Sequence, residues 1–293
     1  MIANTVYNVT EMWVERHLRQ AGMKHYLKEI SGDTIEYWDS GTDKSPLILI
    51  HGFGAESKYQ WYKQVVMLSK QYRLIMPNLL YFGQTTPGSP RFEISDQVDL
   101  IRSLKNHLKI DKTSIIGVSY GGLISAELIR QIPNEISKLV LFDAPIKFMY
   151  HSDIDRVIKE QQVESVESLF VPNDAEGLKK LFYVATSSKF PLPASTMTTF
   201  YEKFYADNVA EKTRLMEKML SSIDEYQERD YCTTVPSLIV WGEDDLLIPV
   251  ERAKLLKEHM GEFTQLEIIK GAGHMPNITK AKRFNQLISD FLV

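Results

Sequence analysis

The residue pattern that most directly suggests chemistry is Gly117-Val118-Ser119-Tyr120-Gly121. It follows a predicted strand at residues 113–116 and precedes a helical pattern that begins near Gly122. A serine in a sharp turn between a strand and a helix can expose its hydroxyl as a nucleophile, and flanking glycines let the backbone make that turn. The alternative is an ordinary glycine-rich turn in which the serine only caps the helix.

A nucleophilic serine needs a base that removes its proton and an acid that orients the base. At a strand-turn-helix site of this kind, the three residues follow one another along the chain in the order Ser, Asp, His. Residues 242–249 (GEDDLLIP) follow a late apolar run, and His274 ends the small-residue turn 271–274 that follows another. The sequence therefore predicts nucleophilic catalysis by Ser119 with His274 as its base.

The elements that must position these residues follow from hydrophobic periodicity. Short apolar runs without strict polar alternation are typical of strands that are buried on both faces of a parallel sheet. One helical face repeats through residues 94–108, and a helix there would connect two parallel strands. We interpret residues 35–39, 46–50, 72–76, 113–116, 139–143, 237–241 and 266–269 as strands, and residues 250–259 and 280–291 as further helices.

The strand signal disappears between residues 145 and 230. We predict an α/β core formed by residues 1–144 and 231–293, and a helical cap formed by residues 145–230. Because ligands bind at the carboxyl ends of the strands in such sheets, the cap should lie above Ser119 and set substrate preference. At least half of its candidate apolar roof residues should serve only to pack the cap onto the sheet. These residues are Phe200, Tyr201, Phe204, Tyr205, Met216 and Met219.

The amino-acid composition excludes several classes of protein. The 293 residues are 44% hydrophobic and 25% charged, with a net charge of −4, which is typical of a folded chain without nucleic acid as a partner. The single cysteine, Cys232, excludes an internal disulfide and a cysteine-rich metal site. Without a leader pattern or a run of ~18 apolar residues, we expect a cytoplasmic chain with no stable membrane insertion. Val14 and Leu18 favour a terminal helix packed on its own domain over one that touches lipid.

From about Met23 to the C-terminus, the chain resembles the α/β-hydrolase superfamily, especially its serine esterase and lipase-like members. Besides the elbow at Ser119, residues 51–54 (HGFG) are similar to the family's HGxx loop. Residues 77–83 (PNLLYFG) resemble its PDLxGxG turn, with asparagine where aspartate is usual, and together with residues 60–64 they resemble monoacylglycerol-lipase-like members. The resemblance implies an eight-stranded, mostly parallel sheet with helices on both faces and an inserted helical cap.

The resemblance also implies roles for individual residues. Ser119 would attack a carbonyl carbon, and His274 would accept and then return the proton. The backbone N–H groups of Phe53 and Tyr120 would bind the developing oxyanion, while His51 would brace the loop that carries Phe53.

The acid of the catalytic set is chosen by the same resemblance. The family usually places it three residues after a glycine and four before a proline, which selects Asp245. Asp244 and Glu243 are its neighbours, and Asp244 fits a loop or helix-capping role better. Asp143 remains an alternative, because some members of the superfamily take their acid from that strand end.

The function that these features favour is cofactor-independent and metal-independent hydrolysis of a small ester with an apolar acyl group. A carbon–carbon bond hydrolase acting on a diketone acid uses the same catalytic residues, but such enzymes usually carry asparagine before the serine, where this chain has Val118. Epoxide hydrolases and haloalkane dehalogenases of this fold have an aspartate in place of Ser119. A ligand receptor that has kept a hydrolase pocket is the third alternative, and the sequence leaves the oligomeric state open.

Overall fold

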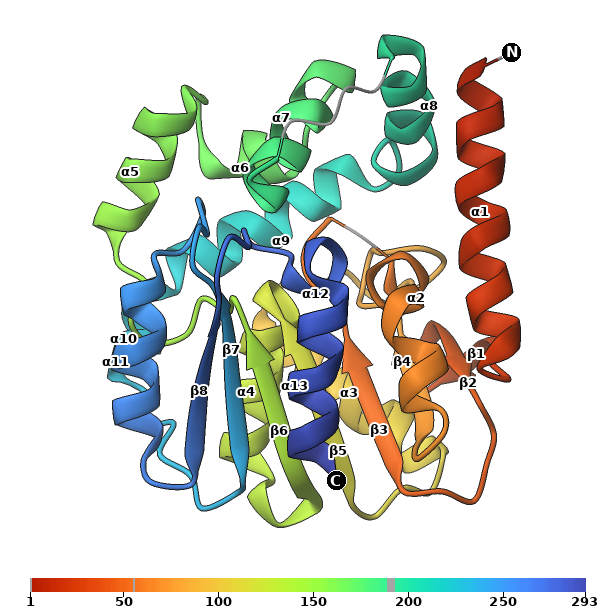
Figure 1. Ribbon diagram of the computed structural model, residues 1–293, viewed down its shortest axis with the longest axis vertical. Helices are drawn as coiled ribbons and strands as arrows, with labels where there is room; N and C mark the ends of the chain where they lie inside the picture. The colour runs from red at the N-terminus through yellow and green to blue at the C-terminus, as the bar shows by residue number, and fades with distance from the viewer. Residues whose placement is uncertain (1, 55, 189–192) are drawn as a thin grey trace.

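In the computed structural model, which describes residues 2–54, 56–188 and 193–293, an eight-stranded sheet forms the centre of the molecule (Figure 1). The strand order is β1-β2-β4-β3-β5-β6-β7-β8. The pairs from β4 through β8 are parallel, whereas β2 pairs antiparallel with both β1 and β4. The predicted α/β fold with a mostly parallel sheet is confirmed. The strands are β1 (Lys24–Ile30), β2 (Asp33–Asp39), β3 (Pro46–Ile50), β4 (Arg73–Pro77), β5 (Thr113–Val118), β6 (Ile136–Phe142), β7 (Ser237–Gly242) and β8 (Thr264–Ile269).

Helices cover both faces of this sheet, which explains the continuous apolar runs in its strands. Successive side chains of a strand point to opposite faces. Accordingly, Leu47 and Leu49 of β3 belong to one hydrophobic core, and Ile48 and Ile50 belong to the other. The first core is covered by α1 (Ile2–Gln20), α2 (Ser57–Leu68) and α13 (Ala281–Leu292), and the second by α3 (Ile94–His107), α4 (Ser119–Gln131) and α11 (Val250–Met260).

The sequence pattern does not predict β1, which lies at one edge of the sheet. Its sequence is KHYLKEI, and Ile30 is its one buried residue. An edge strand with one solvated face carries no continuous apolar run, so hydrophobic periodicity does not detect it. Strand β8, at the other edge, begins at Thr264, slightly before the predicted start at Leu266.

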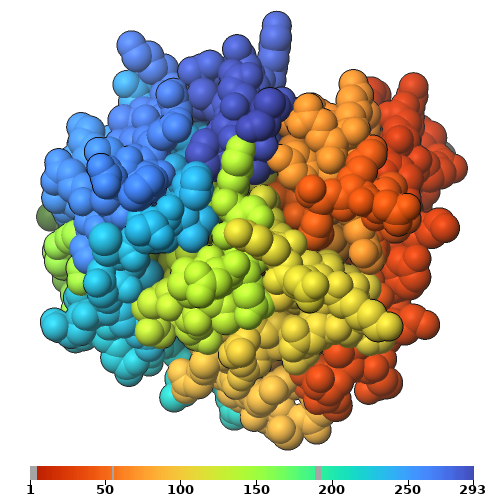
Figure 2. Space-filling model, turned by 90° about the horizontal axis from the view of Figure 1, so that it is seen from below, coloured from red at the N-terminus to blue at the C-terminus, as the bar shows by residue number. Residues whose placement is uncertain are grey.

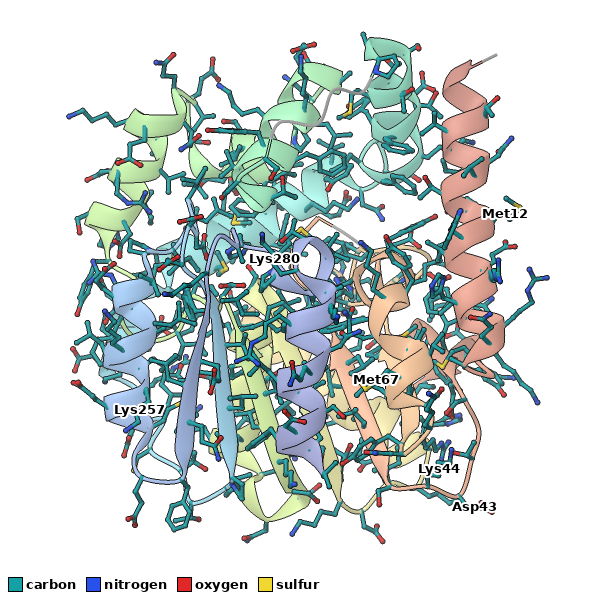
Figure 3. The ribbon with its side chains drawn as sticks, in the orientation of Figure 1. Met12, Asp43, Lys44, Met67, Lys257 and Lys280 are labelled. Atoms are coloured by element: carbon teal, nitrogen blue, oxygen red, sulfur yellow. The ribbon has the colours of Figure 1, made fainter. Side chains whose placement is uncertain are left out.

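Helix α1 packs along the side of the molecule. Val14 and Leu18 are buried in the same core as Trp61 of α2, as expected for a terminal helix packed on its own domain. The opposite side of α1 carries Met12 and Trp13, which are 56% and 53% exposed, and Figure 3 shows Met12 on this outer side. None of the helices in the described ranges combines the length and the apolar content needed to cross a membrane.

All elements between β6 and β7 in the described residues are helical. Helices α5 to α9 lie above the end of the sheet toward which the parallel strands run (Figure 1). Figure 2 shows the face of the molecule opposite these helices. On this face, residues near the two chain ends, in red and blue, lie on either side of the yellow and yellow-green residues. The segment consists of α5 (His151–Gln161), α6 (Val166–Phe170), α7 (Ala175–Thr186), α8 (Ala194–Phe204), α9 (Val209–Ser221) and α10 (Ile223–Glu228).

Candidate active site

Ser119 stands at the junction of β5 and α4 in a backbone conformation that is unusual for a serine. Its φ angle is +50°, in the left-handed region, and 9% of the residue is exposed. A Cβ atom on Gly117 would overlap the Gly121 carbonyl oxygen, and one on Gly121 would overlap the carbonyl oxygens of Ile50 and His51. These close backbone contacts leave no room for a side chain at either glycine of the motif. The surrounding structure keeps Ser119 in its unfavourable backbone conformation.

His274 and Asp245 are in direct contact. The Nδ1 atom of His274 lies 2.8 Å from Oδ2 of Asp245, whose Oδ1 accepts hydrogen bonds from the backbone N–H groups of Leu247 and Ile248 at 2.8 and 3.1 Å. The carboxylate is thus fixed by its own loop, and Nδ1–H of the imidazole donates to it. Nε2 of His274 is buried and has no hydrogen-bond partner among the described residues, so it is available as an acceptor.

Gly242 allows the loops after β7 and β8 to approach one another closely, and Gly273 allows the end of α7 to approach the β8 loop. A Cβ atom on Gly242 would overlap the carbonyl oxygens of Ala272 and Gly273. A Cβ on Gly273 would in turn overlap Ser187 at the end of α7. Since β7 and β8 are parallel neighbours, both loops lie at the carboxyl edge of the sheet, the same edge as Ser119.

The other acidic residues near these strand ends do not contact His274. Asp143, which follows β6, is fully buried and accepts a 2.9 Å hydrogen bond from the Gly242 N–H. Burial, reinforced by the nearby negative charge of Asp245, raises the pKa of Asp143 well above its ordinary value, so its carboxyl group favours the neutral form. Asp244 and Glu243 are exposed at the surface of the β7 loop.

The loop after β3 brings Phe53 beside the serine turn. A Cβ atom placed on Gly52 would lie 3.4 Å from Cβ of Ser119, and the Phe53 N–H donates to none of the described residues. Tyr120 occupies the first turn of α4, where N–H groups have no partner within the helix. The arrangement leaves two backbone donors near Ser119.

His51 supports this loop from inside the protein. Its Nδ1 lies 2.7 Å from the Gly52 carbonyl oxygen, and its Nε2 accepts a 2.9 Å hydrogen bond from the Leu79 N–H. Burial lowers the pKa of His51 to about 4, so the ring is neutral at ordinary pH. With both nitrogens engaged, His51 braces the loop.

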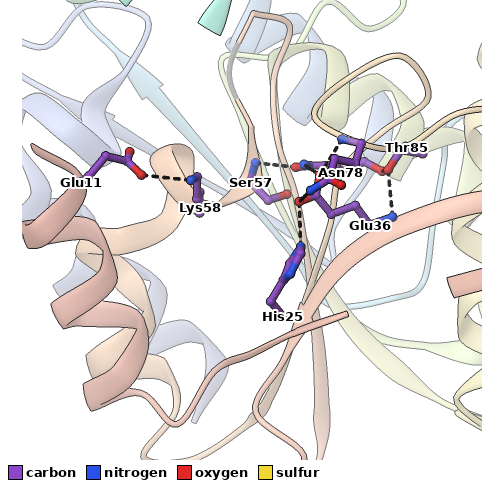
Figure 4. Close-up of polar contacts among 8 residues, drawn as sticks. Glu11, His25, Glu36, Ser57, Lys58, Asn78 and Thr85 are labelled. Atoms are coloured by element: carbon purple, nitrogen blue, oxygen red, sulfur yellow. Dashed lines mark hydrogen bonds and ion pairs between the residues drawn. The ribbon is translucent and has the colours of Figure 1, made fainter. Parts of the chain in front are cut away.

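Asn78, which departs from the family's usual aspartate, belongs to a buried polar cluster behind the loop (Figure 4). Its Nδ2 donates a 2.8 Å hydrogen bond to the buried carboxylate of Glu36, which also lies 2.8 Å from Nε2 of His25. Its Oδ1 accepts from the Ser57 N–H, the first residue of α2, at 2.9 Å. An aspartate at position 78 would oppose Glu36 with a second negative charge, so the neutral amide suits this neighbour.

Ser119 and His274 border two hollows that also share Phe53 and Phe170. The first, of about 30 Å³, is called the methionine hollow here, and its other lining residues are Tyr120, Pro145, Met149, Ile154, Val157, Val166, Met216, Met219, Leu247 and Ile248. The second, of about 80 Å³, is called the tyrosine hollow, and its other lining residues are Gly52, Gly54, Gln60, Val118, Leu181, Phe182, Ala185, Tyr205 and Met275.

The hollows differ in chemical character. Apart from Ser119 and His274, the methionine hollow presents almost entirely apolar side chains, whereas the tyrosine hollow contains the amide of Gln60 and the hydroxyl of Tyr205. The methionine hollow has room for about one water molecule, so a longer group requires movement of its flexible methionines. A larger space of about 900 Å³ is lined by residues of α6, α7 and α8. It shares Phe182 with the tyrosine hollow and no lining residue with the methionine hollow.

Of the apolar residues that the sequence suggested for the roof of the site, only some border the two hollows. Met216 and Met219 line the methionine hollow, and Tyr205 lines the tyrosine hollow. Phe204 instead packs against Tyr59, with ring centroids 4.5 Å apart. Sequence reasoning did not single out Phe170, which carries no local motif and becomes a site residue only through the fold of the helical segment.

The described residues contain no group of three or more His, Cys, Asp or Glu side chains that could hold a metal ion. The fold and the arrangement around Ser119 define the class of the protein as an α/β hydrolase. The family model described as the alpha/beta hydrolase fold matches residues 45–281, and the chain belongs to this family of hydrolases.

Individual relatives fall into two functional groups. The chain is 25% identical over 268 residues to the human monoacylglycerol lipase ABHD6, covering 85% of this chain and 75% of that protein. It is also 25% identical over 294 residues to a 2-hydroxy-6-oxononadienedioate/2-hydroxy-6-oxononatrienedioate hydrolase of Paraburkholderia phymatum, covering 93% of this chain and 96% of that protein.

Solved structures share the fold over nearly the whole chain. A membrane phospholipase A described as a bacterial virulence factor superposes with a TM-score of 0.80 at 21% identity, covering 99% of this chain and 94% of the other. A variant of the meta-cleavage product hydrolase CumD gives a TM-score of 0.77 at 24% identity, covering 92% and 97%. At this identity the likeness extends to the fold alone.

Proposed function

We propose that this chain is a serine hydrolase that cleaves a carboxylic ester, with Ser119, His274 and Asp245 as its catalytic residues. The observation that carries the proposal is the state of the His274 ring. Nδ1 lies 2.8 Å from the Asp245 carboxylate, and Nε2 is buried without a partner among the described residues at a site bordered by Ser119. An imidazole held in this way takes up a proton at Nε2.

The reaction proceeds in two halves. Ser119 Oγ attacks the ester carbonyl carbon while its proton passes to Nε2 of His274, and the N–H groups of Phe53 and Tyr120 bind the resulting oxyanion. The carbon–oxygen bond to the alcohol then breaks, and His274 returns the proton to the leaving alcohol. Water repeats the sequence, with His274 as base, and releases the acid from Ser119. These steps use side chains, backbone N–H groups and water, and they require no cofactor.

We further propose that residues 145–230 act as a cap that selects the acyl group. Met216 and Met219 from this segment line the methionine hollow, whose described lining contains no Asp, Glu, Lys or Arg side chain. Burying a charge there without a partner would be unfavourable. An uncharged, apolar acyl chain is therefore the preferred occupant.

Carbon–carbon bond hydrolysis is the second candidate, because the Paraburkholderia phymatum relative is named for it. The substrate in that name is a dicarboxylate, and a buried carboxylate needs a cationic partner. Neither hollow has Lys or Arg among its described lining residues, and Val118 precedes the serine. These observations favour the ester.

The proposal is tested with p-nitrophenyl esters from acetate to decanoate and a 2-hydroxy-6-oxodienoic acid in parallel. We expect kcat/KM to rise with chain length and then to fall when the hollow is full, by up to roughly fourfold per methylene on the rising limb. Ser119→Ala should abolish turnover and labelling by a fluorophosphonate while the fold is retained. Faster turnover of the dienoic acid, or labelling that persists in Ser119→Ala, would contradict the proposal. Multiple turnovers by the wild type would also exclude a receptor as the sole function.

A further inference from the structure

Arg156, on helix α5, contacts the loop after β7 that carries Asp245. Its Nη1 and Nη2 atoms donate hydrogen bonds to the backbone carbonyl oxygens of Leu246 and Leu247, over 3.2 and 2.9 Å. Nη1 also lies 2.9 Å from the Glu160 carboxylate, one helical turn further along α5. The side chain of Arg156 is 27% exposed, so its guanidinium group is largely enclosed between the helix and the loop.

The two peptide groups that Arg156 contacts are the same two that hold Asp245. The Leu246 carbonyl and the Leu247 N–H belong to one peptide group, and the Leu247 carbonyl and the Ile248 N–H belong to the next. Both N–H groups donate to Oδ1 of Asp245, at 2.8 and 3.1 Å. Because the C=O and N–H bonds of a trans peptide point in opposite directions, each peptide group lies between the guanidinium and the carboxylate.

This arrangement stabilises the position of the carboxylate. A cation at the carbonyl oxygen and an anion at the N–H both interact favourably with the peptide dipole, and hydrogen bonds in such a chain strengthen one another. Rotation of either peptide group would break its hydrogen bonds to Arg156 and to Asp245 together. We propose that Arg156 is a positioning residue for the proposed ester hydrolysis, on which this inference rests. It fixes the two peptide groups that hold Asp245 and, through Asp245, orients His274.

The alternative is that Arg156 only attaches α5 to the core, and a second arginine allows the two roles to be separated. Arg252 of α11 donates to the buried carboxylate of Asp153 on α5, from Nε at 3.1 Å and from Nη2 at 2.9 Å. This ion pair also attaches α5 to the core. In the part of the chain that the structure describes, no hydrogen bond joins the Arg252 side chain to residues 245–248. Arg252→Ala is therefore the matched control for Arg156→Ala.

The first test compares these two variants for turnover of p-nitrophenyl butanoate at equal folded fraction. Arg156→Ala should lower kcat by about tenfold to a hundredfold, because Asp245 is present but no longer held. Arg156 lines neither hollow, so its replacement should change KM by less than about threefold. Arg252→Ala should keep kcat within about threefold of the wild type. An equal loss of kcat in both variants would show that the attachment of α5 is what matters, and it would overturn the inference.

The second test asks whether Arg156 acts through Asp245. In an Asp245→Asn background, Arg156→Ala should lower kcat by less than about threefold more, because the carboxylate through which it acts is already lost. A loss by the same factor in both backgrounds would overturn the inference. If Arg156→Ala does not fold, Arg156→Gln takes its place in every comparison, since its amide can still donate to one of the two carbonyl oxygens.

A third measurement does not depend on turnover. Amide hydrogen exchange at Leu247 and Ile248 should be faster in Arg156→Ala than in both the wild type and Arg252→Ala, because only Arg156 holds these peptide groups. Unchanged exchange at both amides would overturn the inference. A wild type that hydrolyses no ester would refute the proposed function instead, and the exchange rates would still show whether Arg156 holds the loop. Ester turnover through Ser119 without coupling between Arg156 and Asp245 would refute this inference alone.

Discussion

Replacement of Asp245 by asparagine is the most discriminating test of the proposed catalytic set. The carboxylate Oδ1 is held by two backbone N–H groups, which leaves Oδ2 to accept from Nδ1 of His274 at 2.8 Å. In Asp245→Asn, the amide oxygen takes the place of Oδ1, because the backbone donors require an acceptor there. The amide NH₂ then faces His274 and donates to Nδ1, so the neutral ring carries its proton on Nε2.

The size of the effect follows from this reversal. A ring protonated at Nε2 cannot accept the Ser119 proton, and the imidazolium that forms during reaction loses its negative neighbour. Loss of the orienting acid in the best-studied catalytic triad lowers kcat by about 10⁴, which corresponds to about 5 kcal/mol of transition-state stabilisation. We expect a fall in kcat of about 10³ to 10⁴ for Asp245→Asn.

Asp143→Asn is the matched control. Asp143 is buried and accepts from the Gly242 N–H, and burial raises its pKa, so an asparagine reproduces both its shape and its neutral state. Its kcat should stay within about tenfold of the wild type. Both variants are compared for turnover of p-nitrophenyl butanoate at equal folded fraction, established by circular dichroism. A larger loss in Asp143→Asn, or a loss of less than about tenfold in Asp245→Asn, would refute the assignment.

Three further changes test the loop, the elbow and the methionine hollow. Met219→Ala enlarges the methionine hollow that Met219 lines, so the optimum chain length in the p-nitrophenyl series should shift by at least two carbons. Gly121→Ala places a Cβ atom against the carbonyl oxygens of Ile50 and His51 and should lower the unfolding temperature by roughly 5–10 °C, measured calorimetrically. Burial raises the pKa of Glu56 from 4.5 to about 7, so the folded state retains a proton that the unfolded state releases, and the free energy of unfolding falls as pH rises through this window. Glu56→Gln has no titrating carboxyl group at this position. The free energy of unfolding of the variant minus that of the wild type, both measured with urea, should therefore increase by up to ~3 kcal/mol between about pH 5 and about pH 8.

Each of these expectations has a contrary outcome. An unchanged chain-length optimum in Met219→Ala would show that this side chain does not limit the acyl group. A Gly121→Ala protein as stable as the wild type would mean that the elbow tolerates a side chain after small shifts. If Glu56→Gln and the wild type change in parallel with pH, the Glu56 carboxyl group titrates normally in the folded protein.

The fold was predictable because its signals are local. Each central strand contains a short run of apolar residues, and the glycines that the elbow at Ser119 needs are visible in the sequence. β1 was not predictable in this way, since an edge strand is half solvated and KHYLKEI has no apolar run.

The candidate site was less accessible to sequence reasoning, because its details depend on contacts between distant segments. Asp143 and Asp245 both follow strands, so strand positions alone did not distinguish them. The family resemblance selected Asp245, and the fold places its carboxylate 2.8 Å from Nδ1 of His274. The side chain of Gln60, which lines the tyrosine hollow, contacts Asn277, 217 residues further along the chain. Catalytic roles for these residues remain predictions.

The meeting of the two hollows at Ser119 has a kinetic consequence for the proposed reaction. With the acyl chain and the alcohol on separate sides of the serine, the first product can depart while the acyl group stays attached and in place. The space that the departing alcohol leaves is then open to any second nucleophile. Water gives hydrolysis, but an alcohol supplied in excess would compete for the same position, and the acyl group would be transferred to it. The proposed reaction would then follow ping-pong kinetics and yield a new ester together with the acid.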